Sequence, residues 1–304
     1  MGKVGSAAAA GRGRSSGARR AAHVVSGRGL HHTSPAAAAG AAPSLCLTAL
    51  RPHLRVLHLF NTTSLTSLAG IGGLVVLEKG VLTRCSRLYS LSPLGMAPSL
   101  RDIAASQSGV FELTGLALSR TLVSLCLYGC LNLTDVSVCG GIPTLRDMLI
   151  SESTVEVLDG LRESRSRSRL GMRYFDVPLL AALSPVPSLT ILHASSFTRT
   201  SVAALQHCTA LEAVEVSACA QLFDLRPLGL APSSREIVAT GSSVRRISGV
   251  SRSCSLERLL LGQCLRLHDI GPLGECASPR ELHLSGAPVQ LLQVLANPPV
   301  SRSC

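Results

Sequence analysis

The chain repeats one short unit over most of its length, at intervals that are nearly all 22 or 23 residues. Each unit opens with the pattern L-x-x-L-x-L or a close variant, in which apolar and variable positions alternate as in a β-strand with one buried face. A single strand of this kind cannot bury its apolar side alone, whereas many stacked copies can. The period therefore predicts a solenoid built around one parallel sheet. The first positions of the units fall at 54, 77, 100, 122, 145, 170, 189, 211, 234, 256 and 279.

The units are of two alternating kinds. In one kind a cysteine follows the strand pattern, and in the other a serine or another small residue stands there. The second half of the cysteine-containing unit also recurs, as in "SRLYSLSPLGMAPSL" and "AQLFDLRPLGLAPSS". Cys85 and Cys130 are 45 residues apart, as are Cys219 and Cys264, which gives a double period.

These motifs resemble leucine-rich repeat proteins, in particular the cysteine-containing type with C-x-x-L-x-D after the strand. The alternation with P-L-G-x-x-P-S-L is similar to that of kinetoplastid leucine-rich repeat proteins. The resemblance covers roughly residues 45 to 300. It implies an α/β repeat fold: a curved leucine-rich repeat solenoid of about 11 repeats, with the parallel sheet on its concave face. Prolines at 93, 227 and 272 would interrupt a regular helix, so turns or 3-10 pieces are expected on the convex face.

Composition separates a tail from the repeats. Residues 1–44 are rich in Ala, Gly, Ser and Arg, and they are predicted to be a disordered basic tail. Residues 45–304 are predicted to form the repeat domain, with an irregular insertion at 162–169 and weak C-terminal repeats where Ser234 and Pro279 replace leucine. No acidic residue precedes Glu78, so the net charge of +11 mostly describes the tail. The positive charge of the tail is not interleaved with aromatic residues, so this charge does not favour a nucleic-acid partner.

The tail also carries two targeting hypotheses. "MGKVGS" fits the N-myristoylation pattern, which would place the lipid on Gly2 beside a basic stretch. An Arg- and Ser-rich start without acidic residues is also similar to a mitochondrial transit peptide. No apolar stretch is long enough for a membrane helix or a secretory signal, so we expect an intracellular, cytoplasmic protein, with membrane contact only if Gly2 is myristoylated.

The recurring cysteines, Cys85, Cys130, Cys219 and Cys264, are interpreted as buried packing residues. Neighbouring strands lie about 4.8 Å apart, so cysteines two repeats apart would be separated by about 10 Å. That is too far for a disulfide or a shared zinc ion. Asp135, Asp224 and Asp269, which recur five residues after a cysteine, are interpreted as caps of the following backbone amides.

No residue constellation nominates an enzyme. The chain has no G-x-S-x-G, H-E-x-x-H, P-loop or G-x-G-x-x-G motif, and we expect neither a catalytic residue nor a cofactor. His58, His193 and His283 share a phase within the strand pattern but come from distant repeats, so a shared metal site is not expected. "RESRSRSRLG" at 162 to 171 is interpreted as a solvated loop; the alternative is phosphorylation at Ser164, Ser166 or Ser168.

The remaining candidates lie on the predicted concave face. Tyr128, Leu149, Met172 and Tyr174 belong to consecutive repeats and are expected to form one apolar–aromatic patch, which would mark a protein interface. The alternative is an apolar surface without a binding role. We expect a non-enzymatic scaffold that binds a protein partner on this face. The alternative function is substrate recognition in a ubiquitin ligase, although the first 44 residues show no F-box helices. The full set of expected partner-binding residues is Phe60, Tyr128, Leu149, Met172, Tyr174, His193, Leu260 and His283.

Overall fold

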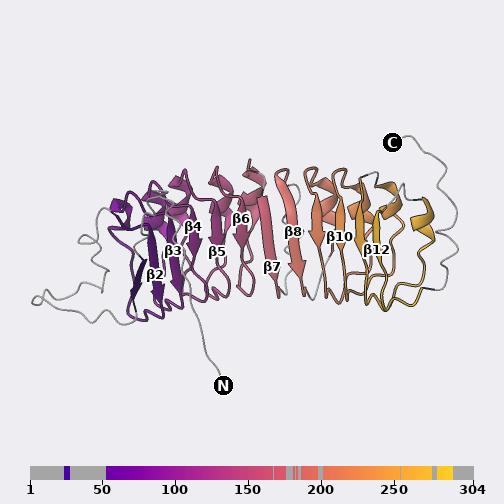
Figure 1. The fold of residues 1–304 in the computed structure, drawn as a ribbon, viewed down its shortest axis with the longest axis horizontal. Coiled ribbons are helices and arrows are strands. Elements are labelled where there is room, and N and C mark those ends of the chain that lie inside the picture. Colours follow the sequence, from indigo (N-terminus) through magenta and orange to yellow (C-terminus); the bar gives the residue numbers. More distant parts are fainter. Residues whose placement is uncertain are drawn as a thin grey trace, which may run out of the picture.

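The computed structural model describes the backbone of residues 24–27, 53–166, 168–175, 181, 183, 186–197, 201–253, 255–275 and 279–289. Its centre is one 12-stranded sheet, in which the strands follow one another in sequence order and every neighbouring pair is parallel. Figure 1 shows the strands side by side along the length of the molecule, with one short coiled segment behind most of them. This order is that of a solenoid in which each repeat contacts only its neighbours.

The strands are short and evenly spaced. They are β1 (Val24–Gly27), β2 (Val56–Phe60), β3 (Lys79–Thr83), β4 (Asp102–Ala104), β5 (Ser124–Cys126), β6 (Asp147–Leu149), β7 (Ser168–Arg173), β8 (Leu189–Ser195), β9 (Ala213–Glu215), β10 (Glu236–Val238), β11 (Arg258–Leu260) and β12 (Glu281–His283).

The return segments of the described repeats contain 3-10 helices rather than α-helices. Pro93 lies at the start of η3 and Pro227 at the start of η9, as the sequence predicted. The segments are η2 (Ile71–Gly73), η3 (Ser92–Met96), η4 (Thr114–Leu118), η5 (Ser137–Gly141), η6 (Asp159–Glu163), η8 (Ala203–His207), η9 (Arg226–Leu230), η10 (Val250–Arg252) and η11 (Gly271–Glu275).

Paired glycines let adjacent 3-10 segments approach closely. A Cβ added to Gly140 would lie 1.8 Å from the carbonyl oxygen of Gly160, and one added to Gly229 would lie 1.8 Å from that of Gly249. No side chain fits at such distances, so Gly140 and Gly229 are required by packing. The same close glycine–glycine approach thus occurs in both halves of the molecule.

Register fixes which side chains face the core. Leu125 of β5 is level with Met148 of β6, Leu170 of β7 and Leu192 of β8, and all four are buried. Leu170 is thus the second apolar residue of its repeat, not the first as predicted. It follows Met148 by 22 residues (170 − 148), and Leu192 follows it by 22 (192 − 170), so the predicted insertion at 162–169 is wrong. Arg167, three residues before Leu170, stands where leucine is expected, and this substitution hid the register.

Strand β1 corrects the prediction for the N-terminal tail. Its four residues pair in parallel with β2, with Val25 level with Leu57. Residues 24–27 therefore continue the sheet by one strand, although they lie in the segment predicted to be disordered. The rest of residues 1–44 lies outside the described residues.

A ladder of small polar side chains runs behind the strands. The Cys130 thiol donates to the carbonyl of Ala105 at 3.0 Å, and the Cys264 thiol donates to that of Ala239 at 3.1 Å. In the alternating repeats, Ser108 and Ser242 use their hydroxyls in the same way, toward Leu82 and Val216. Each group satisfies a carbonyl of the preceding repeat, so cysteine and serine fill the same role at this position.

All four ladder cysteines are buried free thiols: Cys85, Cys130, Cys219 and Cys264. Burial raises the pKa of Cys130 to about 11, so this thiol stays protonated near neutral pH. In the two central repeats Phe175 and Phe197 take the place of the small residues, and their rings stack with centroids 5.7 Å apart. The ladder is thus interrupted at the middle of the molecule.

Candidate functional site

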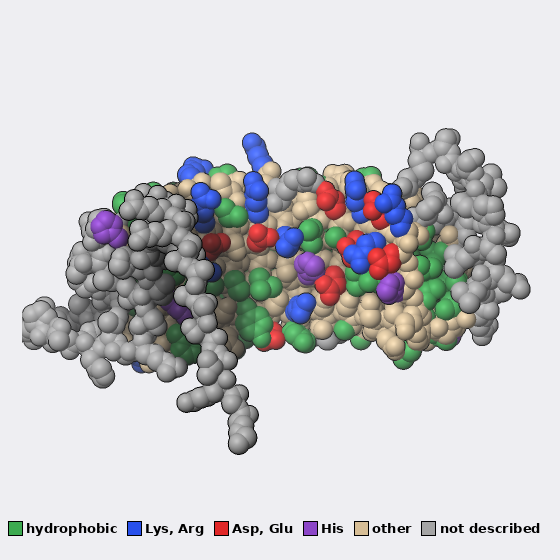
Figure 2. All heavy atoms as spheres, viewed as in Figure 1, with side chains coloured by type: hydrophobic (Ala, Val, Ile, Leu, Met, Phe, Trp, Pro, Cys, Tyr) green, Lys and Arg blue, Asp and Glu red, His purple; other side chains and the backbone are tan. Residues whose placement is uncertain are grey.

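The open sheet face consists of the strand residues that alternate with the buried ones in β2 to β12. Along its midline one residue from each strand lies level with the next. Figure 2 shows hydrophobic side chains over β5 and β6 and a dense group of charged and histidine side chains over β10 to β12. The midline residues are His58, Val81, Ala104, Cys126, Leu149, Gly171, His193, Glu215, Val238, Leu260 and His283.

Met172 is not on this face. Its side chain is 0% exposed and belongs to the core, so the prediction that it contributes to the patch is wrong. The reason is the register of β7: side chains alternate between faces, so the corrected phase turns Met172 inward and Gly171 outward. The patch between Leu149 and His193 therefore contains a glycine where a large apolar side chain was expected.

Tyr174 lies just beyond the end of β7. It is 63% exposed and has a φ of 61°, in a turn position where most repeats have a residue with positive φ. A left-handed backbone is costly for a bulky residue, so this turn is strained relative to the equivalent Gly129. Tyr174 is accessible, but the turn rather than the strand presents it.

Leu149 lies on the open sheet face, and Tyr128 lies beside it in the turn after β5. Leu149 is 38% exposed, and the Tyr128 hydroxyl donates to Glu152 Oε2 at 2.6 Å. This hydrogen bond to a carboxylate raises the pKa of Tyr128. With Cys126 of β5, these residues make one side of a hollow whose other side is charged.

The hollow encloses about 720 Å³ and extends across β5 to β9. The charged rim of the hollow was not predicted from the sequence, because the wrong register of β7 did not place Arg169 and Arg173 on the open sheet face. The alternating "RLGMR" would have revealed them once Leu170 was placed correctly. The lining residues are Ser124, Leu125, Cys126, Tyr128, Asp147, Met148, Leu149, Ser151, Arg169, Gly171, Arg173, His193 and Glu215.

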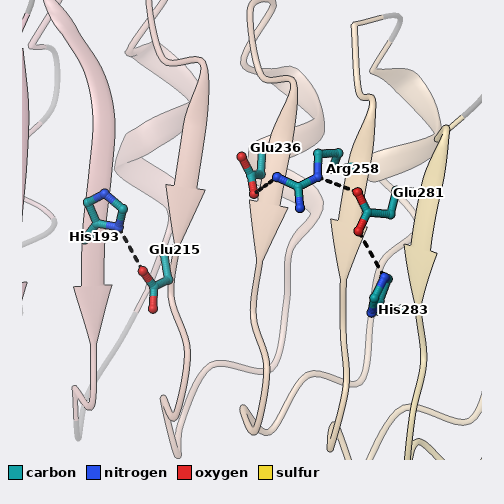
Figure 3. A network of polar contacts seen from close by, with 6 residues as sticks. All are labelled: His193, Glu215, Glu236, Arg258, Glu281 and His283. Carbon is teal, nitrogen blue, oxygen red and sulfur yellow. Dashed lines mark hydrogen bonds and ion pairs between the residues drawn. The ribbon is translucent and has the colours of Figure 1, made fainter. Parts of the chain in front are cut away.

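His193 and Glu215 form the far wall of the hollow (Figure 3). His193 Nδ1 lies 2.8 Å from Glu215 Oε2, and the Ser195 hydroxyl donates to Glu215 Oε1 at 3.2 Å. Partial burial acts to raise the pKa of Glu215, but these hydrogen bonds and the nearby charge of Arg173 outweigh it, and the pKa is lowered.

Beyond the hollow, the polar side chains of β10 to β12 bond to one another (Figure 3). Arg258 bridges Glu236 Oε1 at 2.7 Å and Glu281 Oε2 at 2.6 Å, and His283 Nε2 lies 3.0 Å from Glu281 Oε1. The hydrogen bond to Glu281 raises the pKa of Arg258, and the pKa of Glu281 is lowered in return. Of the residues predicted to bind a partner, His283 is thus held in an ion-pair chain, and Leu260 lies half-buried between these charged strands.

Phe60 is far from this hollow along the sheet. It is the last residue of β2, and the Arg84 guanidinium lies 5.7 Å from its ring centre. The structure therefore brings Tyr128, Leu149 and His193 together, and it leaves Phe60, Leu260 and His283 outside the hollow.

The other predicted residues lie away from the open sheet face. Asp135, Asp224 and Asp269 each accept a hydrogen bond from the backbone amide two residues later, at 2.7, 2.9 and 2.7 Å. Ser164 is 8% exposed and thus inaccessible to a kinase in this conformation, and the Ser166 hydroxyl donates to the carbonyl of Pro143.

Ser168 opens β7, and Gly2 lies outside the described residues. Within the described ranges no helix is long and apolar enough to cross a membrane. In the same ranges no group of three His, Cys, Asp or Glu side chains is placed to hold a metal ion.

No protein-family model and no curated protein matches the chain. Among solved structures, the internalin InlF of Listeria monocytogenes is 18% identical with a TM-score of 0.51, over 80% of this chain and 84% of that one. The internalin InlC2 of the same organism is 17% identical with a TM-score of 0.46, over 68% and 81%. The leucine-rich repeat ectodomain of the Arabidopsis thaliana receptor kinase GASSHO1/SCHENGEN3, solved in complex with CASPARIAN STRIP INTEGRITY FACTOR 2, is 17% identical with a TM-score of 0.49, over 80% and 34%.

The likeness to InlF concerns the fold alone. The chain folds as a leucine-rich repeat solenoid, which confirms the predicted fold class. The finer resemblance to kinetoplastid repeats stays a prediction. The alternative role in a ubiquitin ligase gains no support from these structures.

Proposed function

We propose that this protein is a non-enzymatic scaffold that binds a protein partner in the hollow of its open sheet face. The observation that carries the proposal is the combination of a partly exposed apolar side, formed by Cys126, Tyr128 and Leu149, with a charged side on β7 to β9. Interfaces of this composition bury an apolar centre and use polar groups around it for orientation.

The hollow is also built on rigid elements. Its residues lie on adjacent strands whose inward neighbours, Leu125, Met148 and Leu170, are part of the continuous core. A surface held in this way loses little conformational entropy when a partner binds, which favours affinity. The proposal therefore depends on a preformed site and requires no rearrangement.

The first experiment is to express the full chain in cells, purify it and identify co-purifying proteins by mass spectrometry. Leu149→Asp places a charge on the apolar side of the hollow, and it should weaken a specific partner by about tenfold or more. Leu131→Asp is the matched control, because Leu131 is also an exposed leucine but lies in the turn after Cys130.

Loss of the same partner from Leu149→Asp but not from Leu131→Asp supports the proposal. Equal retention of every stoichiometric partner by both variants, with unchanged folding by circular dichroism, overturns it.

A further inference from the structure

Strand β7 presents an unusual arrangement at the centre of the hollow. Its outward residues are Arg169, Gly171 and Arg173, so two guanidinium-bearing side chains flank a position without a side chain. A Cβ at Gly171 would lie 2.8 Å from Leu149 Cδ1, so the leucine leans over the glycine from the adjacent strand. The result is a small dent with an apolar wall on one side and a basic group at each end.

The arginines of β7 keep hydrogen-bond donors that those of the later strands have used. Arg258 donates to two carboxylates, whereas the one acidic partner of Arg169 among the described residues is Asp147, with Nε and Oδ1 3.8 Å apart. Arg173 has no ion pair or side-chain hydrogen bond with any residue that the structure describes. A guanidinium has five N–H donors, so both arginines retain several.

The acidic groups near the dent do not use up this capacity. Glu215 accepts hydrogen bonds from His193 and Ser195, and it influences Arg173 only through the longer-range attraction between their charges. Asp147 lies near Arg169, at one end of the dent, and forms no ion pair with Arg173. His193 is level with Gly171 on the neighbouring strand, so its ring lies beside the dent as a further polar group.

We infer that this dent receives an acidic side chain, Asp or Glu, from an extended segment of the protein partner. The inference rests on the proposed function and names the chemistry of its partner. Guanidinium groups pair with carboxylates through charge-assisted, often bidentate hydrogen bonds, and Arg173 is free to form them. Leu149 lies one strand away, about 4.8 Å, so an apolar residue next to the acidic one in the partner segment would pack on it.

The test selects peptides and does not require the natural partner. A phage-displayed random dodecapeptide library is panned on the immobilised full chain, and enriched peptides are synthesised with a fluorescent label. We expect enrichment of an Asp or Glu adjacent to an apolar residue. Fluorescence anisotropy should then show that Arg173→Glu weakens binding by about tenfold, and Arg173→Gln by less.

The control is Arg101→Glu, which changes the net charge of the chain equally. Arg101 is exposed directly before β4 and does not line the hollow, and no described residue forms an ion pair with it. Its reversal should change affinity by less than about twofold at physiological salt. Circular dichroism melts of all variants verify that folding is unchanged.

The outcomes separate the two ideas. Peptides with the acidic–apolar pattern that depend on Arg173 and not on Arg101 support the inference. Peptides without an acidic residue that are lost in Leu149→Asp overturn the inference but leave the proposed function intact. An equal loss of peptide affinity in Arg173→Glu and Arg101→Glu would mean that the peptides respond only to the net charge of the chain, which overturns the inference. No enrichment, or binding insensitive to both Arg173 and Leu149, counts against both.

Discussion

The open sheet face has two regions with the same backbone arrangement of parallel strands but different side chains on their surface. On β5 to β7 the outward side chains are partly apolar, and Arg173 has no ion pair or side-chain hydrogen bond with any described residue. On β10 to β12, by contrast, Glu236, Arg258, Glu281 and His283 bond to one another. A surface whose polar groups are already paired gains little when a partner replaces those pairs. Unused donors beside exposed apolar area indicate where a partner would bind.

Below the surface the two regions are alike, because both use the paired glycines of adjacent 3-10 segments. Gly140→Ala and Gly229→Ala should each lower the free energy of unfolding by about 3 kcal/mol, since the new Cβ would overlap a carbonyl oxygen. Urea unfolding measures this loss. Gly141→Ala is the control, because no atom lies within 4 Å of its added Cβ; an equal loss in this variant would contradict the explanation.

The same charge substitution should have different effects on binding in the two regions. Leu149 and Leu260 are midline leucines on β6 and β11. Leu149→Asp should weaken the partner or the selected peptide by about tenfold, and Leu260→Asp should change it by less than about twofold. Titration of both variants against the same labelled peptide checks this, and an equal loss would move the binding surface onto the charged strands.

Acid should lower the stability of the protein partly through Glu215, which lies on β9 between the two regions. The pKa of this carboxyl is lowered from its ordinary value of 4.5, so its contribution to stability is complete above that value. The contribution is lost as the pH falls below 4.5 toward the lowered pKa. Urea unfolding from pH 6 down to about pH 3 should show a smaller acid-induced loss in Glu215→Gln than in the wild type. Parallel curves for the two proteins would refute this role for Glu215.

The smallest effect is expected from the ion-pair chain itself. Arg258→Gln removes both of its charge pairs, but these groups are exposed and screened by water and salt, so the melting temperature should fall only slightly. Peptide affinity should not change. The difference in melting temperature from the wild type should also shrink as salt is added; a large, salt-independent fall would mean that the chain has a packing role.

The amino-acid sequence predicts the architecture, because a period of 22 or 23 residues with alternating leucines favours stacked parallel strands. It also indicated the 3-10 return segments, through prolines that an α-helix would not accept. Tyr128, Leu149 and His193 line the same hollow because their repeats keep the phase of the motif, and their role in binding stays a prediction.

The centre of the site could not be predicted from the sequence, because it depends on the strand register in the folded molecule. Arg167 masks the register of β7, and since side chains alternate between faces, an odd shift exchanges the buried and exposed sets: Met172 became core and Gly171 became surface. The pairing of β1 with β2 could not be predicted, because β1 lacks the repeat motif. Which charges neutralise one another and which stay free depends on the distances between side chains on neighbouring strands, and these are set by register and rotamer and not by spacing along the chain.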